Sequence, residues 1–168
     1  MPLHYAARYQ QLAFAELLIK AGADINGKTN TNNTPLSFSV FTRDTTILSF
    51  LIKSGADVNS VNNSKFSALH VIPLCGTIEA MNVLLAAKAD TTLKNIYGDA
   101  ALHSSVASGK IEFVKSLLEA GANTKAKNDN KKTPGQLAVL YNQPEIRKLI
   151  YSHAKNIAAA KKTSSCQP

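Results

Sequence analysis

Histidine is the most chemically versatile residue type in this chain, and three of its four histidines keep a common spacing. We call the interval from His70 to His103 the repeat step. The interval from His4 to His70 is twice as long. A metal or catalytic site would need their imidazoles to converge. Residues at one position of a stacked repeat instead lie roughly 10 Å apart between neighbouring repeats. We therefore expect structural roles for these three histidines, and a solvated or hydrogen-bonded imidazole at the isolated His153.

The other reactive side chains show no catalytic arrangement. The sequence contains no glycine-rich phosphate loop after a strand, no nucleophile elbow, no Cys-x-x-Cys pair and no His-Glu-x-x-His motif. Its two cysteines, Cys75 and Cys166, lie far apart and predict free thiols in a reducing, cytoplasmic setting, with a nuclear location left open. No secretory signal and no apolar run of about 18 residues is visible. We expect no enzyme activity, cofactor, metal site or membrane span.

The elements that carry these residues are short paired helices. From Gly98 to Ala122 the sequence predicts a first helix that ends at Gly109 and a second helix that ends at Gly121. Gly98 predicts a tight turn before this unit, and Asn32, which tolerates a positive φ, predicts one at the equivalent place. Neither helix can bury its apolar stripe alone, so the unit needs neighbours. The same unit recurs at every repeat step, as shown by leucines in the first helix (Leu3, Leu36, Leu69, Leu102) and in the second (Leu18, Leu51, Leu84, Leu117).

The repeat step is about 33 residues, and this period, together with Pro2-Leu3-His4 and Thr34-Pro35-Leu36, resembles the ankyrin repeat over roughly residues 1–152. The resemblance implies an all-α solenoid of helix-turn-helix repeats with hairpin-like loops. It implies one domain, residues 1–162, of five repeats (1–28, 29–61, 62–94, 95–127 and 128–162), followed by a flexible tail at 163–168. It also implies that the repeated histidine hydrogen-bonds loop backbone between repeats, which suits an imidazole that donates and accepts.

Several positions depart from the repeat pattern. Pro73 lies late in a first helix and should bend or shorten it, because proline lacks the backbone N–H. Lys88 replaces the glycine that ends the other second helices, which predicts local irregularity. Ala100 cannot cap a helix with its side chain, so Asp99 is expected to move the cap by one residue. In the last repeat, good helix formers predict that the final helix continues to about Lys161.

The resemblance further implies non-catalytic protein–protein recognition through a concave groove made of the loops and first helices. Carried over by position, the expected partner-binding residues are Tyr9, Phe41, Phe66, Leu74, Ile96, Tyr97, Lys127, Lys132 and Tyr141. Exposed aromatic residues are common anchors of protein interfaces. The alternative for Phe41 and Tyr141 is that their rings tuck into the ends of the core.

The net charge of +8 is uneven along the chain. Residues 88–168 hold thirteen Lys and Arg against six Asp and Glu, whereas residues 1–87 hold six against five. Four lysines crowd the last loop: Lys125, Lys127, Lys131 and Lys132. These lysines are interpreted either as a solvated basic surface or as a site for an acidic protein partner, and the module is expected to be a monomer.

Two alternatives remain open at this point. The first alternative is that the chain is a targeting fragment of a larger enzyme or secreted effector. The second is that it is an adaptor that uses its basic half to bind anionic membrane or nucleic acid. Base readout is not favoured, because the lysine-rich loop has no arginine and no interleaved aromatic residue beyond Tyr97. No small-molecule substrate is indicated.

Overall fold

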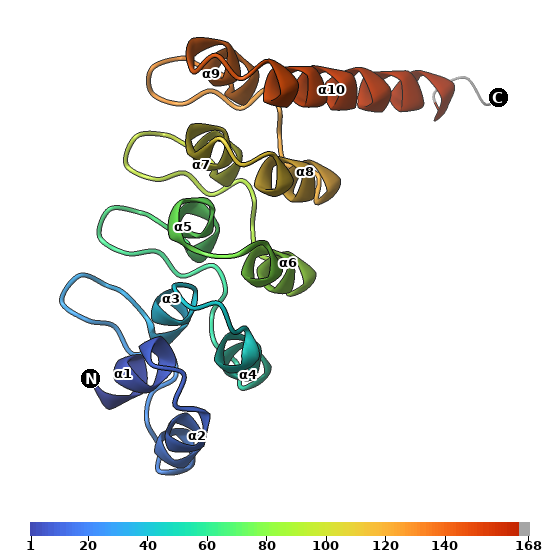
Figure 1. Ribbon diagram of the computed structural model, residues 1–168. Helices are drawn as coiled ribbons and strands as arrows, with labels where there is room; N and C mark the ends of the chain where they lie inside the picture. Colours follow the sequence, from blue (N-terminus) through green and yellow to red (C-terminus); the bar gives the residue numbers. More distant parts are fainter. Residues whose placement is uncertain (165–168) are drawn as a thin grey trace.

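The fold is an array of helix pairs, seen in a computed structural model that describes residues 1–164, with side chains to Ile157. Those residues form helices and no strand. The first helix of each pair is α1 (Pro2–Arg8), α3 (Pro35–Ser39), α5 (Ala68–Cys75), α7 (Ala101–Ser108) or α9 (Pro134–Leu140). The second is α2 (Leu12–Lys20), α4 (Thr46–Lys53), α6 (Ile78–Ala86), α8 (Ile111–Glu119) or α10 (Pro144–Ser164). The two rows of helices run side by side, and long loops project from the first-helix row on the inner side of its curve (Figure 1).

The repeated leucines build a continuous core between the two rows. Leu51, Leu84 and Leu117, each one repeat step from the next, are all fully buried. The first-helix leucines are equally buried, so each pair covers the apolar face of its neighbour. Leu18, at the start of the array, is only partly buried because no pair precedes it in the structure.

Each long loop folds back as a hairpin around a residue with positive φ. The tip residues are Asn32, Lys65, Gly98 and Lys131, with φ of 60°, 57°, 70° and 58°. The expected turns at Asn32 and Gly98 are confirmed, and two lysines adopt the same left-handed conformation. Successive hairpins are joined by backbone bonds of 3.1 Å, in which Asn63, Ile96 and Asp129 donate to Thr31, Ser64 and Tyr97.

The structure corrects two of the expected irregularities. Pro73 lies inside α5 and is buried in the core with Ile72, yet α5 is not shortened: it has eight residues, as many as α7. The shortened first helix is α3, with five residues. Lys88 takes φ of 62° and so forms the same turn that Gly22 and Gly121 form.

Two helix boundaries also differ from the expected ones. The N-cap of α7 is Ala100 itself, and Asp99 does not take its place. The Nδ1 atom of His103 accepts the Ala100 N–H at 3.2 Å, which is the half of a capping box that the third helical residue supplies. Helix α10 continues to Ser164, past Lys161, while residues 165–168 of the expected tail lie outside the described residues.

Candidate binding face and its seam pocket

Histidine side chains link each first helix to the next hairpin at three junctions. The Nε2 atoms of His4, His70 and His103 lie 3.0, 2.9 and 3.1 Å from the backbone carbonyl oxygens of Asn33, Asp99 and Lys132. This confirms the expected bridging role. In His70 and His103, Nδ1 accepts a backbone N–H, so Nε2 is the donor and the imidazole is neutral. Burial lowers the pKa of all three imidazoles and favours this neutral form.

The second repeat lacks this bridge. Ser37 occupies the histidine position, and its hydroxyl donates to the carbonyl of Thr34 at 2.7 Å instead of reaching the next hairpin. The acceptor that a histidine would reach is the carbonyl oxygen of Phe66, one repeat step after Asn33. Helices α1 and α3 pack along their length, as do α5 and α7, but α3 and α5 make few contacts. The α3–α5 junction is therefore a seam in the array.

A pocket lies at this seam, open on the hairpin side. Its volume is about 230 Å³. The apolar walls come from α3, α5 and the second hairpin, with Arg8 of α1 at one side; the main lining residues are Arg8, Ser37, Phe38, Phe41, Phe66 and Val71. We call this the seam pocket.

Aromatic side chains continue outward from the seam pocket. Phe66 meets Tyr97 edge to face, with ring centroids 6.4 Å apart, and meets the ring of His70 at 5.9 Å. The guanidinium of Arg8 lies 5.3 Å from the centroid of the Phe41 ring, a cation–π distance. Phe41 and Phe66 both line the pocket, so two of the sequence-predicted residues come together here and Tyr97 joins them.

The remaining predicted apolar residues are spread over the same side of the molecule. Leu74 and Ile96 are exposed but do not line the seam pocket. Tyr9 stacks on Tyr5 at the start of the array, with ring centroids 5.8 Å apart. Tyr141 follows α9 near the other end. Both Phe41 and Tyr141 are more than 40% exposed, so neither ring tucks into the core.

The backbone carbonyls of the predicted residues Lys127 and Lys132 accept hydrogen bonds, whereas their side chains are exposed to solvent. The Lys127 carbonyl accepts a bond of 2.7 Å from the Lys94 ammonium, and the Lys132 carbonyl accepts the His103 bond. Both Lys127 and Lys132 are exposed. They lie two repeats or more from Phe41 and Phe66 of the seam pocket. Tyr97, by contrast, lies on the neighbouring hairpin, where its carbonyl accepts the Asp129 N–H.

Charge is uneven between the faces of the molecule as well as between the halves of the sequence. We define the hairpin face as the hairpins and first helices, residues 1–11, 28–44, 61–77, 94–110 and 127–143. These segments carry nine Lys and Arg against three Asp and Glu, whereas the rest of the chain carries ten against eight. Most of the net positive charge therefore belongs to the hairpin face.

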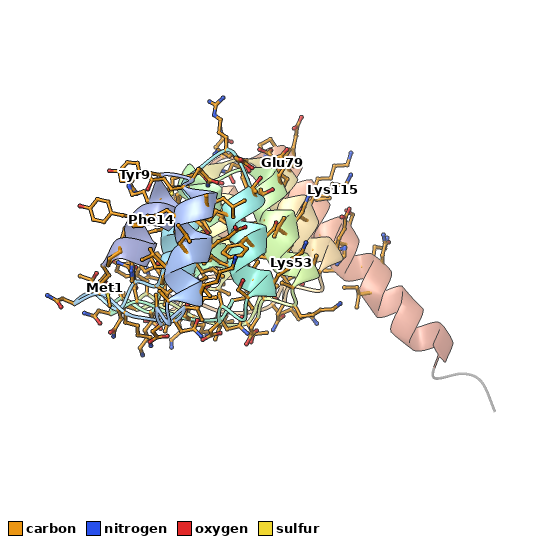
Figure 2. The ribbon with its side chains drawn as sticks, turned by 90° about the horizontal axis from the view of Figure 1, so that it is seen from below. Met1, Tyr9, Phe14, Lys53, Glu79 and Lys115 are labelled. Atoms are coloured by element: carbon orange, nitrogen blue, oxygen red, sulfur yellow. The ribbon has the colours of Figure 1, made fainter. Side chains whose placement is uncertain are left out.

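The first end of the array exposes apolar side chains that the other repeats bury. Phe14 of α2 is 44% exposed, while its counterparts Ile47, Phe113 and Ile146 are all buried. Figure 2 shows Tyr9 and Phe14 on the α1–α2 pair, which forms the end of the array nearest the viewer. This outer face lacks cover in the structure.

Sequence reasoning missed Ser37 and Phe38 as pocket residues. The available signal was a gap in the histidine column, where Ser37 stands between His4 and His70. It also missed the asparagine column Asn62, Asn95 and Asn128, whose side-chain oxygens accept backbone N–H groups and hold the hairpins in shape. The repeat step marks these positions as clearly as it marks the leucines.

The described residues offer no arrangement for metal chemistry. No group of three His, Cys, Asp or Glu among them is placed to hold an ion. Cys75 is a free, exposed cysteine, and desolvation by its neighbours raises the pKa of its thiol, which disfavours the reactive thiolate. Within the described part of the chain, every helix is too short or too polar to cross a bilayer.

Comparison with known proteins agrees with this geometry. The family described as "Ankyrin repeats (3 copies)" matches residues 1–62 and 69–161. No curated protein matches the sequence.

Proposed function

The chain belongs to the ankyrin-repeat family, and from that premise we propose that its hairpin face binds an acidic protein partner without transforming it chemically. Ankyrin repeats are typically protein–protein interaction modules. The observation that carries the acidic character of the partner is the charge of this face, nine Lys and Arg against three Asp and Glu. Surface charge of one sign steers a partner of opposite sign and speeds its association.

The same face supplies apolar anchors. Phe66 and Tyr97 lie in edge-to-face contact on successive hairpins, near the middle of the array. Aromatic residues in this setting, surrounded by contacts that exclude water, often contribute most of the affinity of an interface. We propose that the aromatic residues hold the partner and that Lys127 and Lys132 steer it.

The proposal is tested with a partner recovered using the whole chain as bait. Replacing Phe66 and Tyr97 by alanine should weaken binding by about 2 kcal/mol or more. Reversing Lys127 and Lys132 to glutamate should slow association and reduce its dependence on salt. Far-ultraviolet circular dichroism of each variant confirms that the helices are retained.

The matched control lies on a second helix. Glu112 and Lys115 of α8 are both exposed, and replacing them by alanine should leave the affinity unchanged. Loss of binding in this control alone would place the interface on the wrong side of the array. Steeply salt-dependent binding to DNA or to anionic vesicles, with no acidic protein bound, would replace the protein partner with a phosphate-bearing one.

A further inference from the structure

We propose that the seam pocket receives a single apolar side chain from an acidic linear segment of the partner, and that Ser37 keeps the pocket open. This rests on the proposed function, because it names the chemistry that the hairpin face would recognise.

An imidazole that the preceding junction possesses is missing at the seam pocket. At the preceding junction the ring of His4 packs edge to face on Phe38, with centroids 5.5 Å apart, and its Nε2 reaches the next hairpin. One repeat step later, Ser37 is too short for either contact and bonds back to its own helix. The volume that an imidazole would take between α3 and α5 is left open to solvent.

The size and lining of the pocket define what it can hold. Its volume of about 230 Å³ is below the roughly 300–1,000 Å³ of pockets for small molecules, which suits one side chain. Phe38, Phe41, Phe66 and Val71 form its apolar walls, and Asn33, Ser37, Asn62 and Ser67 complete the lining with polar groups. An apolar side chain placed there is removed from water and makes no demand for polar partners.

Charge at the edge of the pocket selects the neighbours of that side chain. Arg8 is the charged residue among those that line it, and its guanidinium lies over the Phe41 ring, where its N–H donors can pair with a carboxylate. Arginine and carboxylate pair through charge-assisted hydrogen bonds. The hairpin face around the pocket is positive as well, so the occupant is an apolar residue flanked by Asp or Glu.

The experiment pans a random-sequence peptide display library against the whole chain. We expect enrichment of peptides with one apolar residue next to Asp or Glu. Binding should fall at least tenfold in Ser37→His, which fills the pocket and supplies the missing bridge. Ser37→Ala keeps the position small and should bind as the original chain does.

Two further variants locate the contact. Phe41→Ala should weaken binding, whereas Leu140→Ala, the same repeat position on α9 and also exposed, should not. Arg8→Gln should weaken the acidic peptides but not versions in which Asp and Glu are replaced by Asn and Gln. A methyl resonance of Val71 should shift on binding.

The outcomes separate this inference from the proposed function. If acidic peptides bind Ser37→His normally but do not bind Lys127→Glu/Lys132→Glu, the seam pocket is not their binding site. The hairpin face then remains the binding surface. If the enriched peptides lack acidic residues and bind both variants as tightly as the original chain, both proposals are wrong. Absence of any enriched peptide would count against the pocket, since a preformed site on the surface should select ligands.

Discussion

Replacing Ser37 by histidine should stabilise the protein by restoring a bridge that three other repeats possess. In the structure, His70 shows what the new side chain would do, because its Nε2 lies 2.9 Å from a hairpin carbonyl and its Nδ1 accepts the backbone N–H of the N-cap residue. At the seam, the matching acceptor is the Phe66 carbonyl and the matching donor is the Thr34 N–H. The change gives the Phe66 carbonyl a second bond beside the one that it accepts from the Asn62 N–H, and it gives the Thr34 N–H an acceptor.

The size of the effect follows from these contacts. Each new bond is worth about 0.5–1.5 kcal/mol net, and the bond from Ser37 to the Thr34 carbonyl is lost. The balance is about +1 kcal/mol, or roughly 2–4 °C in Tm for a chain of this size. The reciprocal change, His70→Ser, should cost about 1–3 kcal/mol because it leaves buried groups without partners.

Urea unfolding followed by circular dichroism measures both variants and their combination. Ser37→His should raise the midpoint and His70→Ser should lower it. Because the two positions serve different junctions, their effects should be close to additive. If Ser37→His lowered the midpoint or left it unchanged while His70→Ser lowered it, the missing imidazole would not be the cause of the open seam.

Three other predictions concern stability. Leu117→Ala should cost about 2–5 kcal/mol in urea unfolding, since the side chain is fully buried, and a much smaller loss would contradict the stacked core. The free energy of unfolding should fall as pH drops below about 6.5, the ordinary pKa of histidine. Burial lowers the folded-state pKa of His70 and His103, so the unfolded chain binds more protons than the folded one. His103→Gln should reduce this pH dependence, and an unchanged slope of the urea midpoint against pH would refute the prediction. Gly98→Ala should lower the Tm more than Gly55→Ala does. Both glycines have positive φ, but at Gly98 a Cβ would also lie 2.8 Å from the backbone nitrogen of Asp129 in the following hairpin. Equal losses of Tm would show that backbone strain alone acts at Gly98.

The periodic part of the structure was predictable because a strict repeat step fixes which side chains share a position. Leucine and histidine columns predicted the buried rows and the bridges between repeats, and Asn32 and Gly98 predicted hairpin tips. Lys88 was misjudged, because a turn with positive φ favours glycine by only about 1–2 kcal/mol and packing on either side can offset this. The residue type at such a position limits the conformation less than the neighbouring helices do.

The seam pocket was not predictable from the sequence by the same reasoning. It depends on a histidine that is missing and on α3 ending after five residues, whereas the sequence indicated that Pro73 in α5 would disturb its helix. The lysines at Lys127 and Lys132 were placed correctly on exposed hairpin positions, but their distance from Phe41 follows from the stacking of repeats. Whether either set binds a partner stays a prediction.

The seam should also divide the array into two units that open separately. In a repeat array, stability is close to a sum of terms for each unit and for each junction, so opening starts where a junction is weakest. Helices α1 to α4 should then open to hydrogen exchange as one unit, ahead of α5 to α10. A side chain held in the seam pocket would touch α1, α3 and α5 at once. Binding would thereby join two cooperative units into one. Slower hydrogen exchange throughout α1 to α4 would then report occupancy of the seam pocket, although the pocket touches only a few of their residues.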